Sequence, residues 1–328
     1  MEKERIAVAI IYGGMGYESE ISILGYNNVL PHVDRKKYDV VATFIDKEGR
    51  WTVDGRRVIP DKCGFFCPEE GVKIKIDCAF PLLHGDYGED GCVQGALECA
   101  GIPYVGCDVI SSSVCRDKSF VKRLSNSLGI PTLPHTLLLK SEGIDFALRR
   151  CEDEMKYPIF IKPARLGSSV GAGRAEDRDR LRRLISNGFE LCDRLMAEPC
   201  LKDKREIECA YYAGRREIIT NPGEVLIKGT YGYEEKYTIS TPTVTRAEIG
   251  ASLAQDVREY SRRICRLTGI RDIARVDFFL TDEGLYLNEI NTMPGMTESS
   301  LYPKMVEGAG IPMDEMLCGL IDRALCRR

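Results

Sequence analysis

Residues 274–291 carry the sequence ARVDFFLTDEGLYLNEIN. Two runs rich in branched and aromatic side chains flank the central TDEG, whose polar and glycine residues are typical of a tight turn. The pattern therefore predicts a β-hairpin. With the loop centred in TDEG, Asp277 faces Glu289 and Arg275 faces Asn291, and all four side chains lie on one face.

Two carboxylates that face each other across a hairpin repel, so Asp277 and Glu289 should need a cation between them. Together with Asn291 they form an oxygen-rich trio of the kind that binds Mg²⁺, which completes its octahedron with water and substrate phosphates. The alternative is a polar face that is simply solvated. The apolar opposite face favours a metal site, because it anchors the hairpin while the polar face opens into a cleft. Its residues are Val276, Phe278 and Ile290.

Residues 161–171, with the sequence IKPARLGSSVG, contain groups suited to nucleotide phosphates. Lys162 ends a predicted strand, and the following Gly-Ser-Ser allows a loop whose backbone N–H groups approach phosphate oxygens closely. The sequence has no GxxxxGK[ST] motif and no kinase HRD or DFG motif, which excludes a P-loop NTPase and a protein kinase.

The first 110 residues alternate short apolar runs with helical stretches, which predicts an α/β domain with an open parallel sheet. Its first strand runs into Gly13-Gly14-Met15-Gly16, which is not a GxGxxG motif, so a dinucleotide site is disfavoured. Prolines 131 and 134 indicate a junction to a second lobe. The predicted domains are residues 1–110, 111–198 and 199–328.

Composition narrows the functional class. The 328 residues have a net charge of −4 and a pI near 5.7, which argues against bulk binding to nucleic acid or anionic membranes. The apolar run at residues 6–12 is too short for an export signal or a membrane span, so we expect a cytoplasmic protein. The 14 cysteines would then stay reduced, and their spacing shows no zinc motif.

These features, with several further motifs, resemble the ATP-grasp superfamily and, within it, the D-alanine–D-alanine ligase family, over nearly the whole chain. The matching segments are Gly13-Gly14, 18–22 (ESEIS), 83–85 (LHG), 88–91 (GEDG), Gln94-Gly95, Asp117-Lys118, Lys162-Pro163, 167–171 (GSSVG), 234–237 (EEKY), 275–277 (RVD) and 288–297 (NEINTMPGMT).

The resemblance implies an ATP-grasp fold with an N-terminal Rossmann-like domain, and an enzyme that joins two D-alanines for peptidoglycan precursors. ATP is the co-substrate, two Mg²⁺ ions assist, and Mn²⁺ can replace them. The first D-alanine becomes an acyl phosphate, which the amine of the second then attacks. Phosphoryl transfer of this kind needs positioning and charge neutralisation rather than a protein nucleophile. The family is usually homodimeric.

The resemblance also implies roles for individual residues. Glu18 would hold the ammonium of the first D-alanine, with His84 beside it, although a histidine before glycine is as often a structural hydrogen-bonding residue. Arg275 and the Gly295 N–H would stabilise the oxyanion of the tetrahedral intermediate. The residues that receive the carboxylate of the second substrate would be Ser300 and Leu301.

The remaining roles concern ATP and the closure of the site. The residues expected to bind the phosphates are Lys118, Lys162, Ser169 and Lys236. The residues expected to contact adenine and ribose are Glu198, Leu201 and Glu206. The residues expected to close the site over the substrates are Tyr237, Ser168 and Glu18.

The chain departs from the family pattern at Leu166, Gly232 and Cys200. Two other functions therefore stay open at this stage. One is a D-alanine–D-serine ligase of the vancomycin-resistance type. Tyr237 and Ser300-Leu301 resemble the dipeptide-forming enzyme rather than the D-lactate branch of these ligases, and D-serine as the second substrate stays open. The other is a nucleotide-binding protein without turnover, which the presence of Arg275 and the three candidate metal ligands disfavours.

Overall fold

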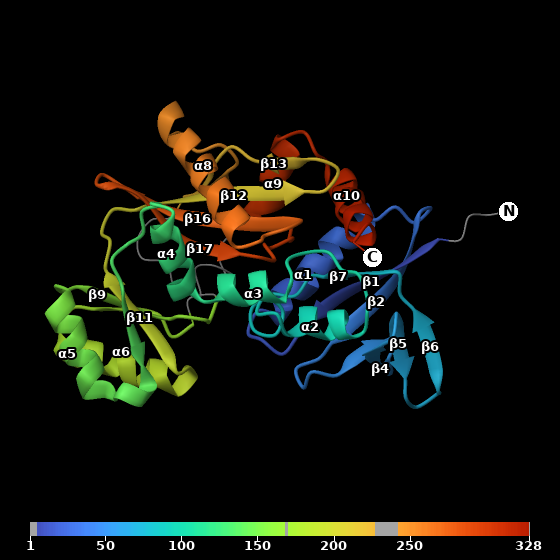
Figure 1. Cartoon of the computed structure of the whole chain (residues 1–328), viewed down its shortest axis with the longest axis horizontal. Helices are drawn as coiled ribbons and strands as arrows, with labels where there is room; N and C mark the ends of the chain where they lie inside the picture. The colour runs from blue at the N-terminus through green and yellow to red at the C-terminus, as the bar shows by residue number, and fades with distance from the viewer. Residues whose placement is uncertain (1–4, 168–169, 227–241, 328) are drawn as a thin grey trace.

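The computed structural model describes residues 5–167, 170–226 and 242–327, and it contains three β-sheets with helices packed against them (Figure 1). Ser168, Ser169, Gly232, Lys236 and Tyr237 lie outside the described residues. Within these ranges, no helix has the length and apolar character that crossing a membrane requires.

The N-terminal sheet is only partly parallel. Its parallel strands are β1 (Ile6–Gly13), β2 (Tyr38–Ile45) and β7 (Cys78–Pro81), as predicted. The antiparallel remainder, which the sequence analysis did not anticipate, consists of β3 (Trp51–Val53), β4 (Arg56–Asp61), β5 (Gly64–Cys67) and β6 (Val72–Lys75). Asp54 and Gly55 both have positive φ, at 49° and 76°, which is the turn that an Asp-Gly pair favours between antiparallel strands.

Helices complete this domain, and one of them comes from the other end of the chain. The local ones are α1 (Ser19–Val29) and α2 (Cys92–Cys99). The C-terminal helix α10 (Met313–Leu325) also packs against this sheet, where Leu320 and Ile321 share a core with Val8 and Phe80 (Figure 1). The first and last segments of the chain therefore fold as one body.

The second sheet has the order β10-β9-β11-β8 and a separate apolar core with two helices. Its strands are β8 (Thr136–Leu139), β9 (Ile159–Pro163), β10 (Gly173–Ala175) and β11 (Arg194–Pro199), and its helices are α5 (Ile144–Glu154) and α6 (Arg178–Leu191). Asp177 caps α6 by accepting a hydrogen bond from the backbone of Arg180. Lys162 and Glu198 lie on adjacent strands of this sheet.

The third sheet contains the predicted hairpin. Its path is β15-β14-β12-β16-β17, with β13 paired to β12. The strands are β12 (Arg205–Ala213), β13 (Glu217–Ile219), β14 (Gly223–Val225), β15 (Thr243–Val244), β16 (Ile273–Thr281) and β17 (Gly284–Asn291). Its helices are α3 (Val109–Arg116), α4 (Lys118–Ser127), α8 (Ala251–Leu267) and α9 (Leu301–Gly308). Helices α3 and α4 pack against β17, although they precede the second sheet in sequence.

The predicted pairing of the hairpin is confirmed: Asp277 is opposite Glu289, and Arg275 is opposite Asn291. The path to this register differs from the expected one. The turn is one residue tighter, with Thr281 paired to Gly284, and a bulge next to Asp277 inserts Asn288 as an extra residue. The bulge restores the pairing that the shorter turn would otherwise have shifted by one residue.

Asp272 joins the C-terminus to the start of β16 through a fully buried carboxylate. It accepts hydrogen bonds from the Gly106 N–H at 2.7 Å and from two nitrogens of Arg327 at 2.5 and 2.6 Å, and the Arg323 Nε lies 3.3 Å away. Its φ of 68° is one that aspartate and asparagine adopt more readily than most residues. This cluster fixes the strand that carries Arg275 and Asp277.

We predict that Asp272→Asn lowers the free energy of unfolding by about 3 kcal/mol, because two arginines lose their buried counter-charge while the backbone conformation stays accessible. Chemical denaturation measures the change. The control is Asp282→Asn in the exposed hairpin turn, where we expect a change below about 0.5 kcal/mol. Equal stability of the two variants would contradict the role of Asp272.

Candidate active site

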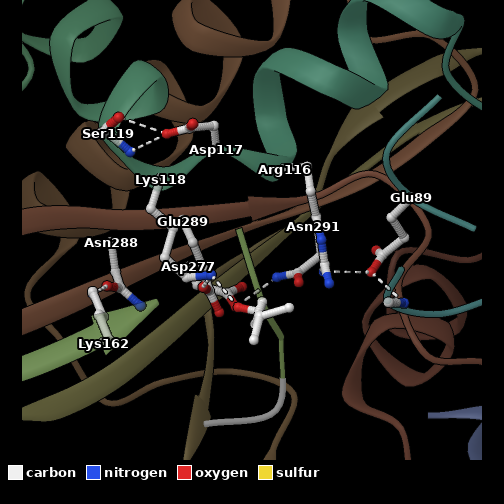
Figure 2. Close-up of polar contacts among 12 residues, drawn as sticks. Glu89, Arg116, Asp117, Lys118, Ser119, Lys162, Asp277, Asn288, Glu289 and Asn291 are labelled. Carbon is white, nitrogen blue, oxygen red and sulfur yellow. Dashed lines mark hydrogen bonds and ion pairs between the residues drawn. The ribbon is translucent and has the colours of Figure 1, made fainter. Parts of the chain in front are cut away.

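The polar face of the hairpin carries two carboxylates that are each paired with a cation (Figure 2). Arg275 donates to both oxygens of Asp277, at 2.8 and 2.7 Å, and the Asn291 amide donates to Asp277 at 2.9 Å. Lys118 Nζ lies 3.3 Å from Glu289 Oε2. Each carboxylate of the predicted pair is thus compensated by a cation of the chain itself. The expected Mg²⁺ at this pair stays a prediction.

A third carboxylate, from Glu208 on β12, also pairs with Arg275. Its Oε2 lies 3.2 Å from Arg275 Nε, and Glu208 is directly opposite Asp277 in the sheet. Asp277 and Glu208 raise the pKa of Arg275 well above its usual range, although burial opposes the charge. Glu208 was not among the residues predicted from the sequence, where it alternates with Glu206 in the charged first part of β12.

On the other side of the hairpin, Glu198 bridges two lysines. Lys122 Nζ lies 2.6 Å from one carboxylate oxygen and Lys162 Nζ lies 2.7 Å from the other, and Lys162 also donates to the bulge residue Asn288 at 3.1 Å. Burial disfavours the charged carboxylate, but the two lysines outweigh it and lower the pKa of Glu198 to about 2. Burial also lowers the pKa of Lys122, which is fully buried and which the sequence analysis did not single out.

The hollow between the second and third sheets is lined by both aromatic and charged side chains. Glu198, Cys200 and Leu201 line one part of it, together with Phe160 and Phe279. Glu206 lines the adjoining part, and its carboxylate pairs with Lys204 Nζ at 2.7 Å. The amine of Lys204 also lies 4.1 Å from the centre of the Phe279 ring. The residues predicted for adenine and ribose therefore line two adjoining parts of this hollow, and Phe160 and Phe279 belong to both.

A second hollow opens between the N-terminal domain and the third sheet. It is lined by Glu18, His84, Gly295, Ser300 and Leu301, together with Arg275. His84 Nδ1 makes a hydrogen bond of 3.1 Å with the Met293 carbonyl. The Ser300 hydroxyl accepts a hydrogen bond of 3.0 Å from the Thr297 N–H at the start of α9. The structure thus brings together the described residues predicted for the amino-acid substrates.

The two hollows meet at the hairpin. Both are lined by Lys118, Gly167, Glu208, Arg275 and Glu289. Figure 2 shows Lys162 and Asn288 on one side of Asp277 and Glu289, and Arg116 and Glu89 on the other. A group bound in one hollow can therefore react with a group bound in the other at this junction.

The donor set at the junction fits magnesium only when substrate oxygens complete it. Within residues 5–167, 170–226 and 242–327, no cluster of three or more His, Cys, Asp and Glu side chains is placed to hold a metal. Asp277 and Glu289 supply two carboxylates and Asn291 supplies an amide. This hard, oxygen-based set with few protein ligands is typical of Mg²⁺ sites that also bind phosphates.

Comparisons with known proteins agree with this geometry. The family model "D-ala D-ala ligase N-terminus" matches residues 7–107, and "D-ala D-ala ligase C-terminus" matches residues 124–322. A D-alanine--D-alanine ligase from Caldicellulosiruptor bescii is 36% identical over 98% of this chain and 95% of its own length.

Two solved structures are also similar. The VanG D-Ala:D-Ser ligase of Enterococcus faecalis has a TM-score of 0.88 at 31% identity, covering 98% of this chain and 100% of that one. A D-alanine--D-alanine ligase of Bacillus anthracis complexed with ATP has a TM-score of 0.76 at 28% identity, covering 98% of each chain. The expected ATP-grasp fold is confirmed, and the chain belongs to the D-alanine–D-alanine ligase family of ATP-dependent ligases.

Proposed function

We propose that this protein joins two molecules of D-alanine with ATP and releases D-alanyl-D-alanine, ADP and phosphate. The carboxylate of the first D-alanine attacks the γ-phosphate, and ADP leaves. The amine of the second D-alanine then attacks the acyl phosphate, loses its proton, and displaces phosphate. The observation that carries this proposal is the meeting of the two hollows at Lys118, Arg275 and Glu289. Synthesis of a peptidoglycan precursor in the cytoplasm follows from this reaction.

ATP is the co-substrate of this family, and the first hollow has the groups to bind it. Lys118 and Lys162 line it and would neutralise phosphate charge, while Glu198 and Leu201, which line it with Phe160 and Phe279, would contact the purine. Burial lowers the pKa of Lys118, although Glu289 opposes this shift. The ribose contact of Glu206 and the phosphate contacts of Ser169 and Lys236 stay predictions.

Asp277, Glu289 and Asn291 would hold the two Mg²⁺ ions, which Mn²⁺ can replace. When bound, such ions neutralise phosphate charge and polarise the phosphorus–oxygen bond. The chain's own contribution is to hold the three ligands on one rigid hairpin and to keep Asp277 oriented by Arg275 and Asn291.

The amino-acid hollow supports the remaining roles. Glu18 would hold the first ammonium group, and Arg275 with the Gly295 N–H would stabilise the oxyanion of the tetrahedral intermediate. His84, Ser300 and Leu301 would orient the two carboxylates. The closing contacts of Ser168 and Tyr237, and a homodimer, stay predictions from the family resemblance.

The first experiment identifies the product. We expect the protein with ATP, Mg²⁺ and D-alanine alone to release phosphate and form D-alanyl-D-alanine, detected by mass. A D-serine ligase is the second candidate, because the VanG structure is also similar. Phosphate release that depends on added D-serine, with a mixed dipeptide as product, would replace the first proposal by the second. Absence of phosphate release with either amino acid would indicate a binding protein without turnover.

We predict that Glu289→Gln lowers kcat for phosphate release by at least about 100-fold, because it removes a carboxylate from the proposed metal site at the point where charge develops. Raised Mg²⁺ should restore part of the rate. The matched control is Glu283→Gln in the exposed turn of the same hairpin, which should keep the full rate. Normal turnover of Glu289→Gln at ordinary Mg²⁺ would remove Glu289 from the metal site.

We predict that Glu198→Gln raises KM for ATP by about ten-fold and destabilises the fold by about 3 kcal/mol, because the buried Lys122 loses its counter-charge. The pKa of Glu198 is lowered from 4.5 to about 2, so its ionic contribution is fully present above about pH 4.5 and is lost as the pH falls towards 2.

Thermal unfolding of wild type and Glu198→Gln across this pH range tests the second part. The difference between their midpoints should shrink as the pH falls. A difference that stays constant down to about pH 2.5 would show that the Glu198 charge does not stabilise the fold. Glu283→Gln again provides the exposed control.

A further inference from the structure

The guanidinium of Arg116 is buried in the wall of the second hollow, which is lined by Glu18, His84 and Gly295 and is proposed to bind the amino acids. Arg116 has no role in the reaction proposed above. Arg116 ends α3, and its side chain is 11% exposed. Its Nη2 donates to Asp86 Oδ1 at 2.7 Å, and its Nη1 lies 3.4 Å from Glu89 Oε2. Figure 2 shows Arg116 beside Glu89, away from Asp277 and Glu289.

A third carboxylate, Glu18, lies close to the same guanidinium. A Cβ placed on Gly167 would be 2.8 Å from Glu18 Oε2 and 3.2 Å from Arg116 Nη1, so both groups lie beneath this glycine. Burial opposes the charge of Arg116, but Glu89, Asp86 and Glu18 together raise its pKa. One cation therefore compensates three carboxylates from two segments, Glu18 before α1 and the pair Asp86 and Glu89 in the loop before α2.

Glu89 connects this charge cluster to the shape of the hollow. It is 7% exposed, and its two oxygens accept hydrogen bonds from the Gly85 N–H at 3.0 Å and the Met293 N–H at 3.3 Å. The Met293 carbonyl also bonds to His84. Burial raises the pKa of Glu89 and Arg116 opposes that shift. Through these two hydrogen bonds, Glu89 holds the His84 loop against the segment that follows β17.

We propose that Arg116 is a positioning residue for the amino-acid substrate: its guanidinium holds the carboxylates of Glu18, Asp86 and Glu89 side by side, so that Glu18 can receive a substrate ammonium and Glu89 can hold the wall of the hollow. The inference rests on the proposed function, because it assigns the ammonium to an amino-acid substrate. Three carboxylates around one guanidinium leave a net negative site, which attracts an ammonium group.

Other charged or titratable groups face this hollow, but the cations among them are engaged elsewhere. In the described part of the chain they are His84, Cys115, Lys118, Glu208, Arg275 and Glu289. Lys118 pairs with Glu289, and Arg275 pairs with Asp277 and Glu208. Burial raises the pKa of the Cys115 thiol to about 12, so it stays neutral. Arg116 is therefore the counter-ion for Glu18, Asp86 and Glu89.

The test measures kcat/KM for D-alanine as a function of pH. Arg116 lowers the pKa of Glu89, so without the guanidinium Glu89 binds its proton more tightly, and we expect Arg116→Met to move the acid limb of the profile upward by about one pH unit or more. It should also raise KM for D-alanine at neutral pH by about ten-fold, while ATP affinity measured without D-alanine stays unchanged. Arg116→Lys, which keeps a cation, should restore most of the limb position.

We expect Asp86→Asn to shift the acid limb of the kcat/KM profile in the opposite direction. It removes one partly exposed carboxylate that shares Arg116 with Glu89, so Glu89 ionises more easily and the acid limb should move downward. This variant keeps the inference testable even where Arg116→Met fails to fold. An acid limb that stays in place in Asp86→Asn, or that stays in place in a folded Arg116→Met with uniformly reduced activity, would overturn the role of Arg116.

The control is Arg271→Met, which removes another partly buried arginine, bonded to the Gly106 carbonyl and the Tyr104 hydroxyl outside both hollows. Its pH profile should match that of the wild type. The two proposals fail in different ways. A wild-type protein that forms no dipeptide would reject the proposed function, whereas an active wild type with an immobile acid limb in the variants would reject only the role of Arg116.

Discussion

The active site depends on the compensation of buried carboxylates by cations from other segments. Arg275 is the central case, because it bonds to Asp277 on its own strand and to Glu208 on the neighbouring strand. Leaving any one of these charges unpaired in a low-dielectric interior costs several kcal/mol, so the three side chains order one another. The site is thus arranged before a substrate binds, which is what electrostatic stabilisation of a transition state requires.

Buried carboxylates are also compensated by cations from other segments on both sides of the hairpin. On the nucleotide side, Lys122, Glu198 and Lys162 form one chain of ion pairs that ends at Asn288. On the amino-acid side, Arg116 compensates its own carboxylates. The backbone bulge at Asn288 joins these features, because it turns an extra amide towards Lys162 while keeping Asp277 opposite Glu289.

The sequence was sufficient to predict the hairpin and its pairing, because those depend on local patterns. The cap of α4 is equally local, since Asp117 accepts a hydrogen bond from the Ser119 backbone two residues later. The antiparallel part of the N-terminal sheet also has a local signal in the sequence, the turn pair Asp54-Gly55, which the prediction did not use.

Glu208, Lys122 and Arg116 could not be assigned from the sequence for a different reason. Each pairs with a residue that is distant in the sequence. Lys122 of α4 pairs with Glu198 of β11, and Arg116 at the end of α3 pairs with Glu89 in the loop before α2. A charged residue in such a position has the same sequence signature as a solvated surface residue. Only the packing of the sheets and helices reveals that the charge is buried and must therefore be paired.

The short segment after β17 explains why the two halves of the site act together. Asn291, a proposed metal ligand, is followed two residues later by Met293, whose N–H binds Glu89 and whose carbonyl binds His84. These contacts attach the N-terminal domain to the end of the hairpin through one backbone unit. A shift of the His84 loop therefore acts directly on the strand that carries Glu289 and Asn291. The reacting carboxylate and the γ-phosphate must meet within contact distance in the proposed reaction, so we expect this short connection to contribute to the geometry of the phosphoryl transfer.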